Sequence, residues 1–355
     1  MRLGEIELIK GREASDEQFR ALHVLRNIMH AERAPEDPPF SLEQTVAEYR
    51  DLPAYREDYR WLVWDDDHQE LEGTGVAVFT ESDENQHLVN FSIWVLPGRR
   101  RQGIGTRILA EIAGLAQSLG RTRLLVYTVS IVPSGEAFLR HIGAEPGLYG
   151  HLQELRLEEV DRTLLRRWQE RAQERAAGFS LTVWEGPPFP EEDLEAVAAM
   201  YDAANDIPHG DLAIEEFHKT PEQIRALDES LAAQGMVHWT IAAREAVTGR
   251  IAGFHDLYWS PLQPEIMRVG VTAVFNEYRN RGLGRWLKAA MVEKALRERP
   301  EARRMQTGNA TVNAAMLKIN EELGFRVTRQ ITAWEMPVEL VLHGERGTFT
   351  PGQHE

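Results

Sequence analysis

The sequence predicts an α+β protein built from two similar domains in tandem. Its 355 residues suit two domains of about 150 residues each, both large enough to bury a core. A turn of the form Arg-x-x-Gly-x-Gly occurs twice, starting at Arg100 and at Arg279. Each half also shows the same order of strand-like and helix-like segments. A repeat of this length indicates a duplicated fold.

Each half begins with a strand, two helices and a pair of strands joined by a short polar turn. In the N-terminal half we expect these segments at Ile6–Gly11, Asp16–Ala34, Ser41–Leu52, Trp61–Asp65 and Gly73–Thr80. In the C-terminal half we expect them at Ser180–Glu185, Glu191–Ala204, Pro221–Gln234, Val237–Ala243 and Ile251–Trp259. A capping-box pattern from Ser41 to Gln44 marks the start of one helix.

A strand enters each glycine turn and a helix leaves it. Apolar residues alternate before the turns, at Val89, Phe91, Ile93 and Val95 in the first copy and at Met267, Val269 and Val271 in the second. After the turns they recur at helical spacing, at Ile108, Ile112, Leu115 and Leu119 and then at Leu283, Leu287, Ala290 and Met291. Gly120 and Pro300 are expected to mark where these helices end.

Both turns have the chemistry of an anion site. Two glycines let the backbone approach a pyrophosphate closely, and the free N–H groups of the following helix attract negative charge. Arginines gather there, namely Arg99, Arg100 and Arg101 at the first turn and Arg279, Arg281 and Arg285 at the second. They could be solvated residues of an ordinary helix start, but clustering at both turns favours phosphate contact.

The segment between the halves, Asp161–Ala177, is charged and carries apolar residues at helical spacing, so we expect a connecting helix and not a loose linker. The chain would then divide into an N-terminal domain (residues 1–160), this connection (161–178), a C-terminal domain (179–340) and a tail (341–355). The last stretch, Gly344–Glu355, has no period and is expected to be mobile.

The composition narrows the function classes. The net charge of −16 argues against a nucleic-acid or membrane partner and permits a cationic substrate, although an acidic surface can serve solubility alone. The chain has no cysteine, which excludes disulfides, thiolate metal sites and a cysteinyl acyl-enzyme. We expect no metal site. Because the sequence shows no membrane-spanning run and no secretion signal, we expect a cytoplasmic monomer or homodimer.

With these features the chain resembles the GNAT acyltransferase superfamily, whose signature is Arg/Gln-x-x-Gly-x-Gly/Ala between a strand and a helix. The likeness continues in the C-terminal half through Thr307–Asn309, Asn313–Met316 and Asn320–Phe325, and more weakly in the N-terminal half through Ser134–Ala144. The layout is similar to that of mycothiol synthase and of tandem acetyltransferases of bacteria. The resemblance implies two three-layer domains of α/β type, each with a mixed, mostly antiparallel sheet flanked by helices.

The resemblance also implies acetyl-CoA as the cofactor, bound at one or both turns. In the C-terminal half the contacting residues would be Val274, Arg279, Asn280, Arg281, Gly282, Leu283, Gly284, Arg285, Asn309 and Asn313. In the N-terminal half they would be Val95, Arg100, Arg101, Gln102, Gly103, Ile104, Gly105 and Thr106. The two asparagines of the C-terminal half could equally serve a strand end and a helix N-cap.

The usual catalytic groups of the superfamily have no direct match. Many members place a glutamate as base eleven residues before the signature arginine, and the residues at that position here are Arg268 and Val89. The nearest titratable substitutes are Glu265, His255 and Asp256. The tyrosine that many members use as acid corresponds to Asn320 and Leu139. Its role would fall to Tyr258, Tyr278, another residue or water, or the thiolate would leave unprotonated.

The C-terminal half is expected to be the catalytic one because it keeps the asparagine pair, where the N-terminal half carries Pro133. Its loop 205–211 would line the acceptor site through Asp206, His209 and Asp211, or would simply make turns. We interpret the chain as an N-acetyltransferase that acts on a primary amine of a small molecule by direct attack in a ternary complex. The alternatives are a non-catalytic acetyl-CoA sensor and a protein or peptide N-acetyltransferase.

Overall fold

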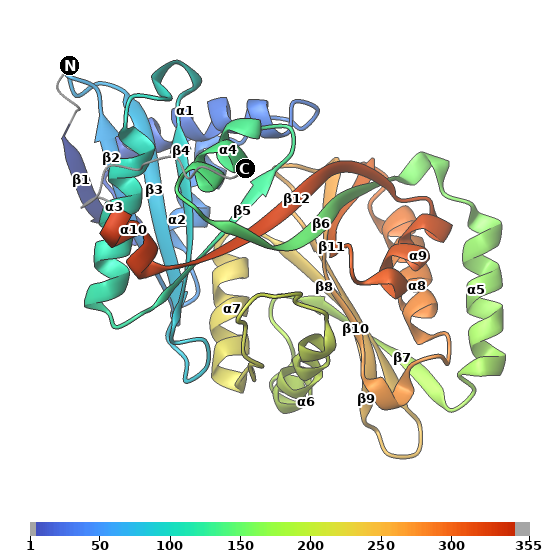
Figure 1. Cartoon of the computed structure of the whole chain (residues 1–355). Coiled ribbons are helices and arrows are strands. Elements are labelled where there is room, and N and C mark those ends of the chain that lie inside the picture. The colour runs from blue at the N-terminus through green and yellow to red at the C-terminus, as the bar shows by residue number, and fades with distance from the viewer. Residues whose placement is uncertain (1–4, 345–355) are drawn as a thin grey trace, which may run out of the picture. The chain divides into compact units, whose positions relative to one another are not determined.

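The computed structural model describes residues 5–344 (Figure 1). These residues form two compact units. The N-terminal unit comprises residues 5–50, 55–148 and 331–344, and the C-terminal unit comprises residues 51–54 and 149–330.

The N-terminal unit has a sheet with the strand order β1-β2-β3-β4-β5-β12 (Figure 1). These strands are β1 (Ile6–Lys10), β2 (Arg56–Trp64), β3 (Leu71–Thr80), β4 (Leu88–Val95), β5 (Arg123–Val129) and β12 (Arg326–Pro337). Neighbours are antiparallel except β4 and β5. One face packs on α1 (Asp16–Arg33) and α2 (Leu42–Arg50), and the other on α3 (Ile104–Ser118), α4 (Pro133–His141) and α10 (Val338–Gly344).

The C-terminal unit repeats this plan with the order β6-β11-β10-β9-β8-β7. Its strands are β6 (Glu145–Arg156), β7 (Phe179–Gly186), β8 (Val237–Glu245), β9 (Ile251–Trp259), β10 (Ile266–Val274) and β11 (Arg304–Ala310). Only β10 and β11 are parallel among these described neighbours. One face packs on α5 (Arg162–Arg175), α8 (Leu283–Glu298) and α9 (Ala314–Leu323), and the other on α6 (Leu194–Met200) and α7 (Pro221–Ala233).

The predicted fold class is confirmed: each unit has three layers, with helices on both faces of a mixed, mostly antiparallel sheet. Local signals place the helices. The Ser41 hydroxyl accepts the Gln44 N–H at 3.1 Å while the Ser41 N–H donates to Gln44 Oε1 at 2.8 Å, so the predicted capping box is present. The same reciprocal pair joins Thr220 and Gln223 at the start of α7.

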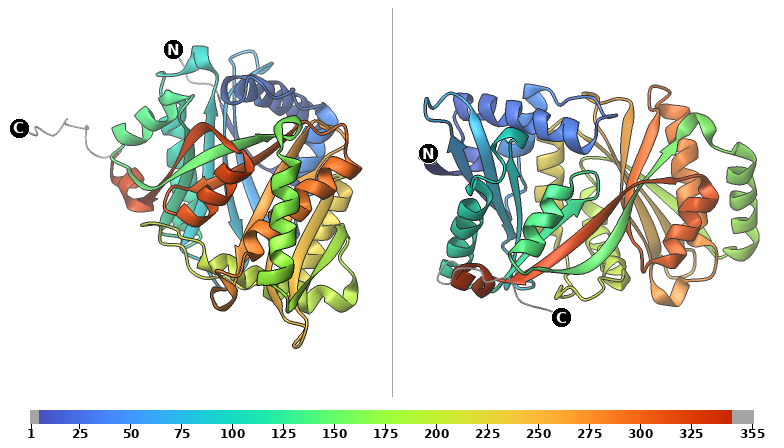
Figure 2. Two further views of the ribbon diagram at one scale, coloured as in Figure 1. Left: turned by 90° about the vertical axis from the view of Figure 1, so that its right-hand side faces the viewer. Right: turned by 45° about the horizontal axis from the view of Figure 1, so that its top comes forward.

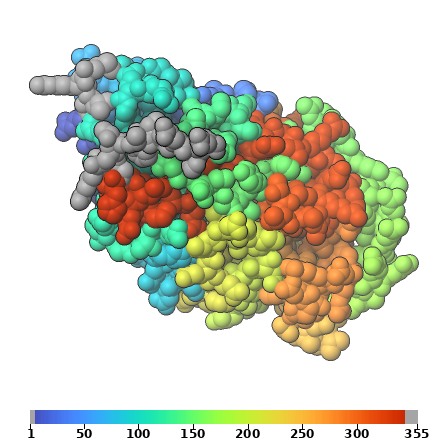
Figure 3. Space-filling model, viewed as in Figure 1, coloured from blue at the N-terminus to red at the C-terminus, as the bar shows by residue number. Residues whose placement is uncertain are grey.

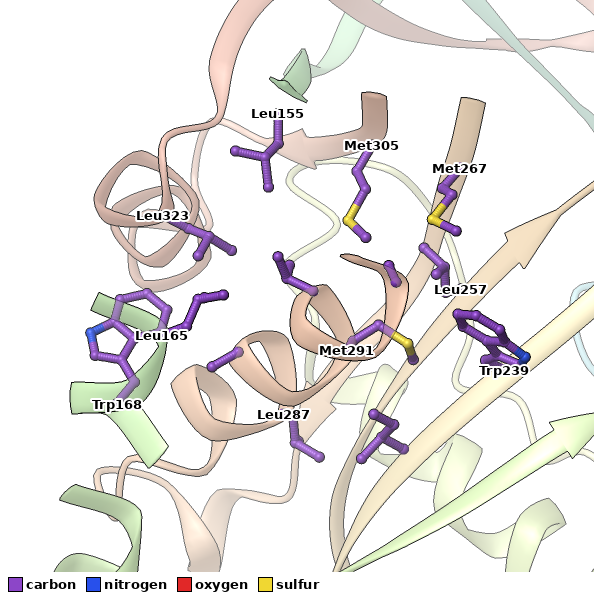
Figure 4. Close-up of a cluster of buried hydrophobic side chains, with 14 of the residues drawn as sticks. Leu155, Leu165, Trp168, Trp239, Leu257, Met267, Leu287, Met291, Met305 and Leu323 are labelled. Atoms are coloured by element: carbon purple, nitrogen blue, oxygen red, sulfur yellow. The ribbon is translucent and has the colours of Figure 1, made fainter. Parts of the chain in front are cut away.

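The core of the C-terminal unit lies between its sheet and α8. Figure 4 shows Met267 and Met305 of the sheet pointing toward α8, the helix that carries Met291 and Leu287, and all four side chains are fully buried. Helix α5, predicted from its apolar spacing, packs along α8 (Figure 2) through an apolar stripe that includes Trp168. Burial of each such large side chain stabilises the fold by about 1.5–3 kcal/mol.

The helix predicted at Glu191–Ala204 is shorter than expected. Only Leu194–Met200 is α-helical, and the 3-10 turns η4 (Glu191–Asp193) and η5 (Tyr201–Asp206) flank it. The tighter turns after the helix carry Tyr201 and Asp206 toward the sheet, where both make hydrogen bonds described below.

The compact units differ from the linear ranges 1–160, 161–178 and 179–340. Strand β5 pairs with β12 from the end of the chain, while β6 pairs with β11. Trp334 of β12 is fully buried in the N-terminal unit and its indole N–H donates to the Thr128 hydroxyl at 2.8 Å. Strand patterning shows that a segment is a strand but not which edge it joins. Of the predicted tail, residues 341–344 belong to helix α10, and residues 345–355 lie outside the described residues.

Candidate functional site

The two glycine turns have the same backbone. In the C-terminal unit Asn280 and Gly282 have φ of 64° and 85°, and α8 begins at the next residue. In the N-terminal unit Arg101 and Gly103 have φ of 63° and 85°, and α3 begins directly after them. Left-handed residues at alternate positions direct successive N–H groups to one side, and such a backbone binds anions. The predicted order of strand, turn and helix is therefore confirmed in both copies.

The turn of the C-terminal unit leaves room for a phosphate. A Cβ atom built on Gly282 would have no heavy atom within 4 Å, so the backbone is open there. A Cβ on Gly284 would lie 3.4 Å from Ile319 Cδ1, which is ordinary contact. The positive φ also disfavours any branched residue at Gly282. These features fit the pyrophosphate of a nucleotide cofactor.

The signature arginine braces each turn in the same way. Arg279 Nε donates to the Val274 carbonyl at 3.1 Å, and its guanidinium lies 3.6 Å from the Asp206 carboxylate. In the N-terminal unit Arg100 Nε donates to the Val95 carbonyl at 3.2 Å and its guanidinium pairs with Glu32. These arginines therefore hold the turn to the strand before it.

The remaining arginines of the second turn differ in what they contact. Arg285 pairs with Glu322 at 2.8 and 2.9 Å, and this hydrogen bonding lowers the pKa of the Glu322 carboxyl. Arg281 makes no ion pair among residues 5–344, and its guanidinium lies 5.7 Å from the rings of Phe179 and Tyr278. Arg281 is thus the cation of this turn that remains available for a phosphate.

The first turn has fewer side chains to offer. The Gln102 amide donates to the Gly98 carbonyl at 3.2 Å, while Arg101 and Thr106 are exposed. Ile104, like Leu283 in the second turn, is buried and anchors its helix to the sheet. Gly105 has the Phe138 ring 3.7 Å from the position of a Cβ.

The parallel strands of both units separate toward the glycine turn. Strand β10 pairs with β11 only from Ile266–Arg304 to Arg268–Gln306, although β10 continues to Val274 and β11 to Ala310. In the same way β4 pairs with β5 only at residues 88–90. Within residues 5–344, the facing backbone groups of these strand pairs form no ladder beyond these points. Such an opening accepts an extended ligand that carries amide groups, because the free N–H and C=O groups need partners.

The fourth strand is bulged in the C-terminal unit. The pairing of β10 with β9 shifts by one residue between Val269 and Thr272, whereas β4 pairs with β3 without a shift over the described residues. A Cβ on Gly270 would lie 2.6 Å from the Tyr258 ring and 3.0 Å from Asp256 Cβ. The bulge thus sits directly on two polar side chains of β9, at a close approach that only glycine allows.

A polar cluster lies on the α6–α7 face of the sheet behind this bulge. It consists of Tyr201, Lys219, His238, Thr240, Asp256 and Tyr258. Asp256 is fully buried and accepts hydrogen bonds from the Tyr201 hydroxyl at 2.9 Å and from the Thr240 hydroxyl at 2.6 Å. The Tyr258 side chain is hydrogen-bonded to Tyr201 and stacks on His238 at 4.4 Å.

Burial shifts the pKa values of two side chains in this cluster. It raises the pKa of the Tyr201 phenol well above its usual range, and the Asp256 charge adds to this effect. Burial likewise lowers the pKa of the Lys219 ammonium against the opposing charges of Asp256 and Asp228. Two buried atoms here have no hydrogen-bond partner among residues 5–344, namely His238 Nδ1 of the cluster and Oδ1 of Asp228 in α7. Burial raises the pKa of Asp228.

The opposite face of β9 carries a second titratable pair. His255 Nδ1 lies 2.8 Å from the Thr272 hydroxyl, and its ring also bonds the Val271 backbone, so this side chain holds the bulge from the α8 side. Burial, and then the Lys288 charge, lower the pKa of His255 well below its usual value. Burial lowers the pKa of Lys288 to about 7, and its ammonium faces the Phe325 ring at 5.5 Å. His255 is therefore a neutral support of the bulge.

The N-terminal unit lacks these groups at equivalent places. Gly73 pairs with Val95 as Gly253 pairs with Val274, and this register matches β3 to β9 residue by residue. The positions of His255, Asp256 and Tyr258 are then occupied by Gly75, Val76 and Val78, and the position of Lys288 by Leu109. Only the C-terminal unit, within the described chain, combines a bulged strand with polar groups on both sides of it.

The asparagines expected at the cofactor make contacts inside the protein. Asn309 and Asn320 both donate to Gln153 Oε1, at 3.3 and 2.9 Å. Asn320 is fully buried and its Oδ1 has no hydrogen-bond partner. Asn313 is the N-cap of α9, where its side chain accepts the Met316 N–H at 3.3 Å. The capping interpretation of Asn313 is confirmed.

The structure separates the three candidate bases. His255 and Asp256 flank the bulge from opposite faces. Glu265 is exposed at the start of β10, where its carbonyl accepts the N–H groups of Arg303 and Arg304. Five residues of strand separate Glu265 from the bulge, a distance of about 17 Å.

The three residues predicted in the acceptor loop also have different surroundings. Asp206 Oδ1 accepts the Asn276 amide at 2.6 Å, so Asp206 supports the glycine turn and does not face the polar cluster. His209 is partly exposed and Asp211 fully so, in a segment without regular structure. The loop is closed by Asn205, whose side chain bonds the backbone of Phe217 at both N–H and C=O.

The sequence reading missed Tyr201, Lys219 and His238. A signal for His238 was present, because His238 and Thr240 occupy alternate positions of an otherwise apolar strand, as do Asp256 and Tyr258 on the next one. Buried polar residues at a period of two belong to one face and need each other as partners. No comparable signal marks Tyr201 or Lys219, which reach the sheet from a 3-10 turn and a coil.

The other features of residues 5–344 do not indicate a second candidate site. A surface hollow of about 520 Å³ in the N-terminal unit is lined by residues 80–83, 86–87 and 119–121, at the far end of α3 from its glycine turn. Residues 5–344 contain no cluster of three or more metal-ligating side chains. None of the described helices is long and apolar enough to cross a membrane.

Comparison with known families gives one match. The family described as "Acetyltransferase (GNAT) family" matches residues 25–140 and 197–325, which is most of the chain and includes both glycine turns. A search of curated proteins found no relative.

Several solved structures share the fold. A tandem GNAT protein from the clavulanic acid biosynthesis pathway is 23% identical over 94% of this chain and 99% of its own, with a TM-score of 0.74. A GCN5-related N-acetyltransferase from Sphaerobacter thermophilus is 15% identical over 93% and 96%, with a TM-score of 0.61. A glucosamine N-acetyltransferase region of a fungal multi-domain β-N-acetylglucosaminidase is 13% identical over 95% and 38%, with a TM-score of 0.64. At these identities the likeness shows the fold.

Proposed function

The chain belongs to the GNAT family of acetyltransferases, and on that premise we propose that its C-terminal unit transfers the acetyl group of acetyl-CoA to a primary amine of a small molecule. One observation carries the proposal. Only this unit, within the described residues, places a bulged and separated strand β10 against a buried polar cluster. Family membership supports acyl transfer with an acetyl-CoA donor. That the acceptor is a primary amine, and that this amine belongs to a small molecule, is our inference.

The donor would be held by the turn and the opening beside it. The N–H groups around Gly282 and the Arg281 guanidinium would bind the pyrophosphate, and the free backbone edge of β10 up to Val274 would bind the amides of the arm. Acetyl-CoA supplies an activated thioester. Because the chain has no cysteine, we favour direct attack by the amine in a ternary complex.

The bulge would position the reacting carbonyl. A bulged residue is left out of the ladder, so its N–H is free to stabilise the negative charge that develops on a carbonyl oxygen. His255 holds this geometry through Thr272 and Val271. In this role His255 is a positioning residue and not the base.

Asp256 would be the final proton acceptor. Tyr258 packs on the bulge and is hydrogen-bonded to Tyr201, whose hydroxyl donates to Asp256 at 2.9 Å. The neutral amine attacks through its nitrogen lone pair, and the surplus proton on that nitrogen can pass to the Tyr258 oxygen while each hydroxyl gives its own proton to the next group. The path ends on the carboxylate. This proton path would take the role of the glutamate that many family members use as base. Arg268 occupies the position of that glutamate here.

The charge of the site supports a cationic acceptor. Asp228 and Asp256 are both buried beneath the α6–α7 face, and the whole chain carries a net charge of −16. A partner amine bound as an ammonium would find carboxylates and aromatic rings there, which are the groups that bind ammonium ions.

Thiol release from acetyl-CoA across polyamines, amino sugars, amino acids and peptides would test the function. We expect turnover on a small amine, and we expect Tyr258→Phe and Asp256→Asn to lower kcat about 100-fold while acetyl-CoA binding stays within about threefold. The matched control is Tyr127→Phe, an exposed tyrosine of the N-terminal unit, which should change nothing.

Tight acetyl-CoA binding without turnover on any class of amine would favour the sensor alternative. That alternative has one observation in its support, since Arg268 and Asn320 stand where the family usually has its glutamate and tyrosine. Turnover on peptides alone would favour the protein or peptide acetyltransferase.

A further inference from the structure

Lys219 occupies an ammonium site inside the C-terminal unit. Its Nζ lies 3.6 Å from the centre of the Tyr201 ring, and the carboxylates of Asp256 and Asp228 both act on its charge. An aromatic face binds an ammonium group by a cation–π interaction, and the negative charges of the two carboxylates favour a cation there. The lysine therefore fills, from within the chain, a place suited to the amine of an acceptor.

The chain contains only five lysines, and Lys219 differs from the other four. Lys10 and Lys318 are exposed, and Lys10 pairs with Glu57. Lys294 pairs with Glu185 and Glu298, and Lys288 of α8 is buried in the core of the C-terminal unit. Lys219 alone among them is half-buried on the α6–α7 face, in a segment at the molecular surface that is coloured yellow in Figure 3.

Lys219 is also close to the bulge. The Tyr201 ring beneath its Nζ is hydrogen-bonded through its hydroxyl to Tyr258, and the Tyr258 ring lies against Gly270. Two aromatic side chains thus separate the amine from the bulged residue. The backbone before Lys219 is held by Asn205 at Phe217, so any change in this distance comes from rotation about the bonds of the flexible four-carbon lysine stem.

We infer that Lys219 is a self-acetylation site of this protein, modified at its own catalytic centre when no acceptor amine is bound. The inference rests on the proposed function, because the same centre must bind acetyl-CoA. Burial lowers the pKa of Lys219, so more of it is the neutral amine that can attack.

In the proposed acetyl transfer to Lys219, the groups already named account for every bond, electron pair and proton. The Nζ lone pair attacks the thioester carbonyl, the N–C bond forms, and the C–S bond breaks with its electron pair leaving on sulfur. The surplus proton on nitrogen passes through Tyr258 and Tyr201 to Asp256. The products are an ε-acetyl amide and CoA, and no other reactant is needed.

The experiment is incubation of the full chain with isotopically labelled acetyl-CoA and no added amine, followed by intact mass measurement and peptide mapping. We expect one acetyl group on Lys219, formed at least about tenfold faster than on Lys10 or Lys318, because a held amine reacts as an intramolecular partner. Lys219→Arg should remove the label and keep acetyl-CoA binding measured by calorimetry. Gly282→Val, which alters the glycine turn, should suppress labelling of Lys219 alone.

Each other result has a definite meaning. Equal labelling of Lys10, Lys318 and Lys219, unchanged by Gly282→Val, would show uncatalysed acetylation and overturn the inference. No label on Lys219 in a protein that turns over an external amine would overturn it and leave the proposed function standing. Failure to bind acetyl-CoA at all would remove the proposed function, and the inference with it.

Discussion

Individual residues around the bulge of β10 differ from those at the equivalent positions in the N-terminal half of this duplicated chain. Where the N-terminal unit has Gly75 and Leu109, the C-terminal unit has His255 and Lys288, two titratable groups enclosed in the core. A buried lysine destabilises the folded state because burial disfavours its charged form. Retaining one behind the bulge is typical of a site where function outweighs stability.

Replacement of this lysine should stabilise the protein in a pH-dependent way. The pKa of Lys288 is about 7 in the folded chain against 10.5 ordinarily, so between these values the unfolded chain holds a proton that the folded chain has lost. Stability therefore rises with pH across this window. Lys288→Met should raise the free energy of unfolding by on the order of a few kcal/mol near pH 6, and the gain should fade near pH 10.

Urea denaturation of both proteins at the two pH values would measure this. Lys294→Met on the same helix is the control, since Lys294 is paired with two glutamates and its loss should not stabilise the protein. A gain from Lys288→Met that is independent of pH would mean that apolar packing, and not proton binding, accounts for it.

At the scale of elements, both units have the same order of strand, glycine turn and helix. The strand that enters the turn differs between them in its pairing. Both turns share the left-handed backbone and the bracing arginine. Of the two strands that enter these turns, β10 is bulged and β4 pairs with β3 without a register shift. Both turns thus have the backbone that our proposal assigns to phosphate binding, while only one of them follows a bulged strand.

A matched pair of substitutions tests which turn serves catalysis. Gly282→Val places a branched side chain at φ of 85°, where phosphate must approach, and should weaken CoA binding at least about tenfold. Gly103→Val makes the same change in the N-terminal unit and should affect activity less. Calorimetry with CoA and the amine assay on both variants decide the question. The reverse order would assign catalysis to the N-terminal unit.

At the scale of the whole molecule, the last strand of each repeat belongs to the sheet of the other. The end of the chain completes the N-terminal unit, with Trp334 fully buried beside Thr128, while Phe325 nine residues earlier packs in the core of the C-terminal unit. Neither repeat, taken as a linear segment, has a complete sheet.

Two substitutions close together in the sequence should therefore destabilise different units. Trp334→Ala should cost about 3–5 kcal/mol and raise hydrogen exchange in β3, β4 and β5 of the N-terminal unit. Phe325→Ala should cost a similar amount and raise exchange in β10 and β11. Exchange measured by mass spectrometry on both variants would reveal the division, and equal changes in both units after either substitution would contradict it.

The sequence by itself determined the duplication, the fold class, most element positions and the two glycine turns, because these depend on local signals such as periodicity, glycine spacing and capping residues. The tertiary structure decided the rest. Whether a strand is bulged, which edge β12 joins, and which of Glu265, His255 and Asp256 lie at the bulge all depend on pairing between distant segments. Tyr201 and Lys219 join the cluster only because the chain folds back over β9, and no local pattern encodes that contact.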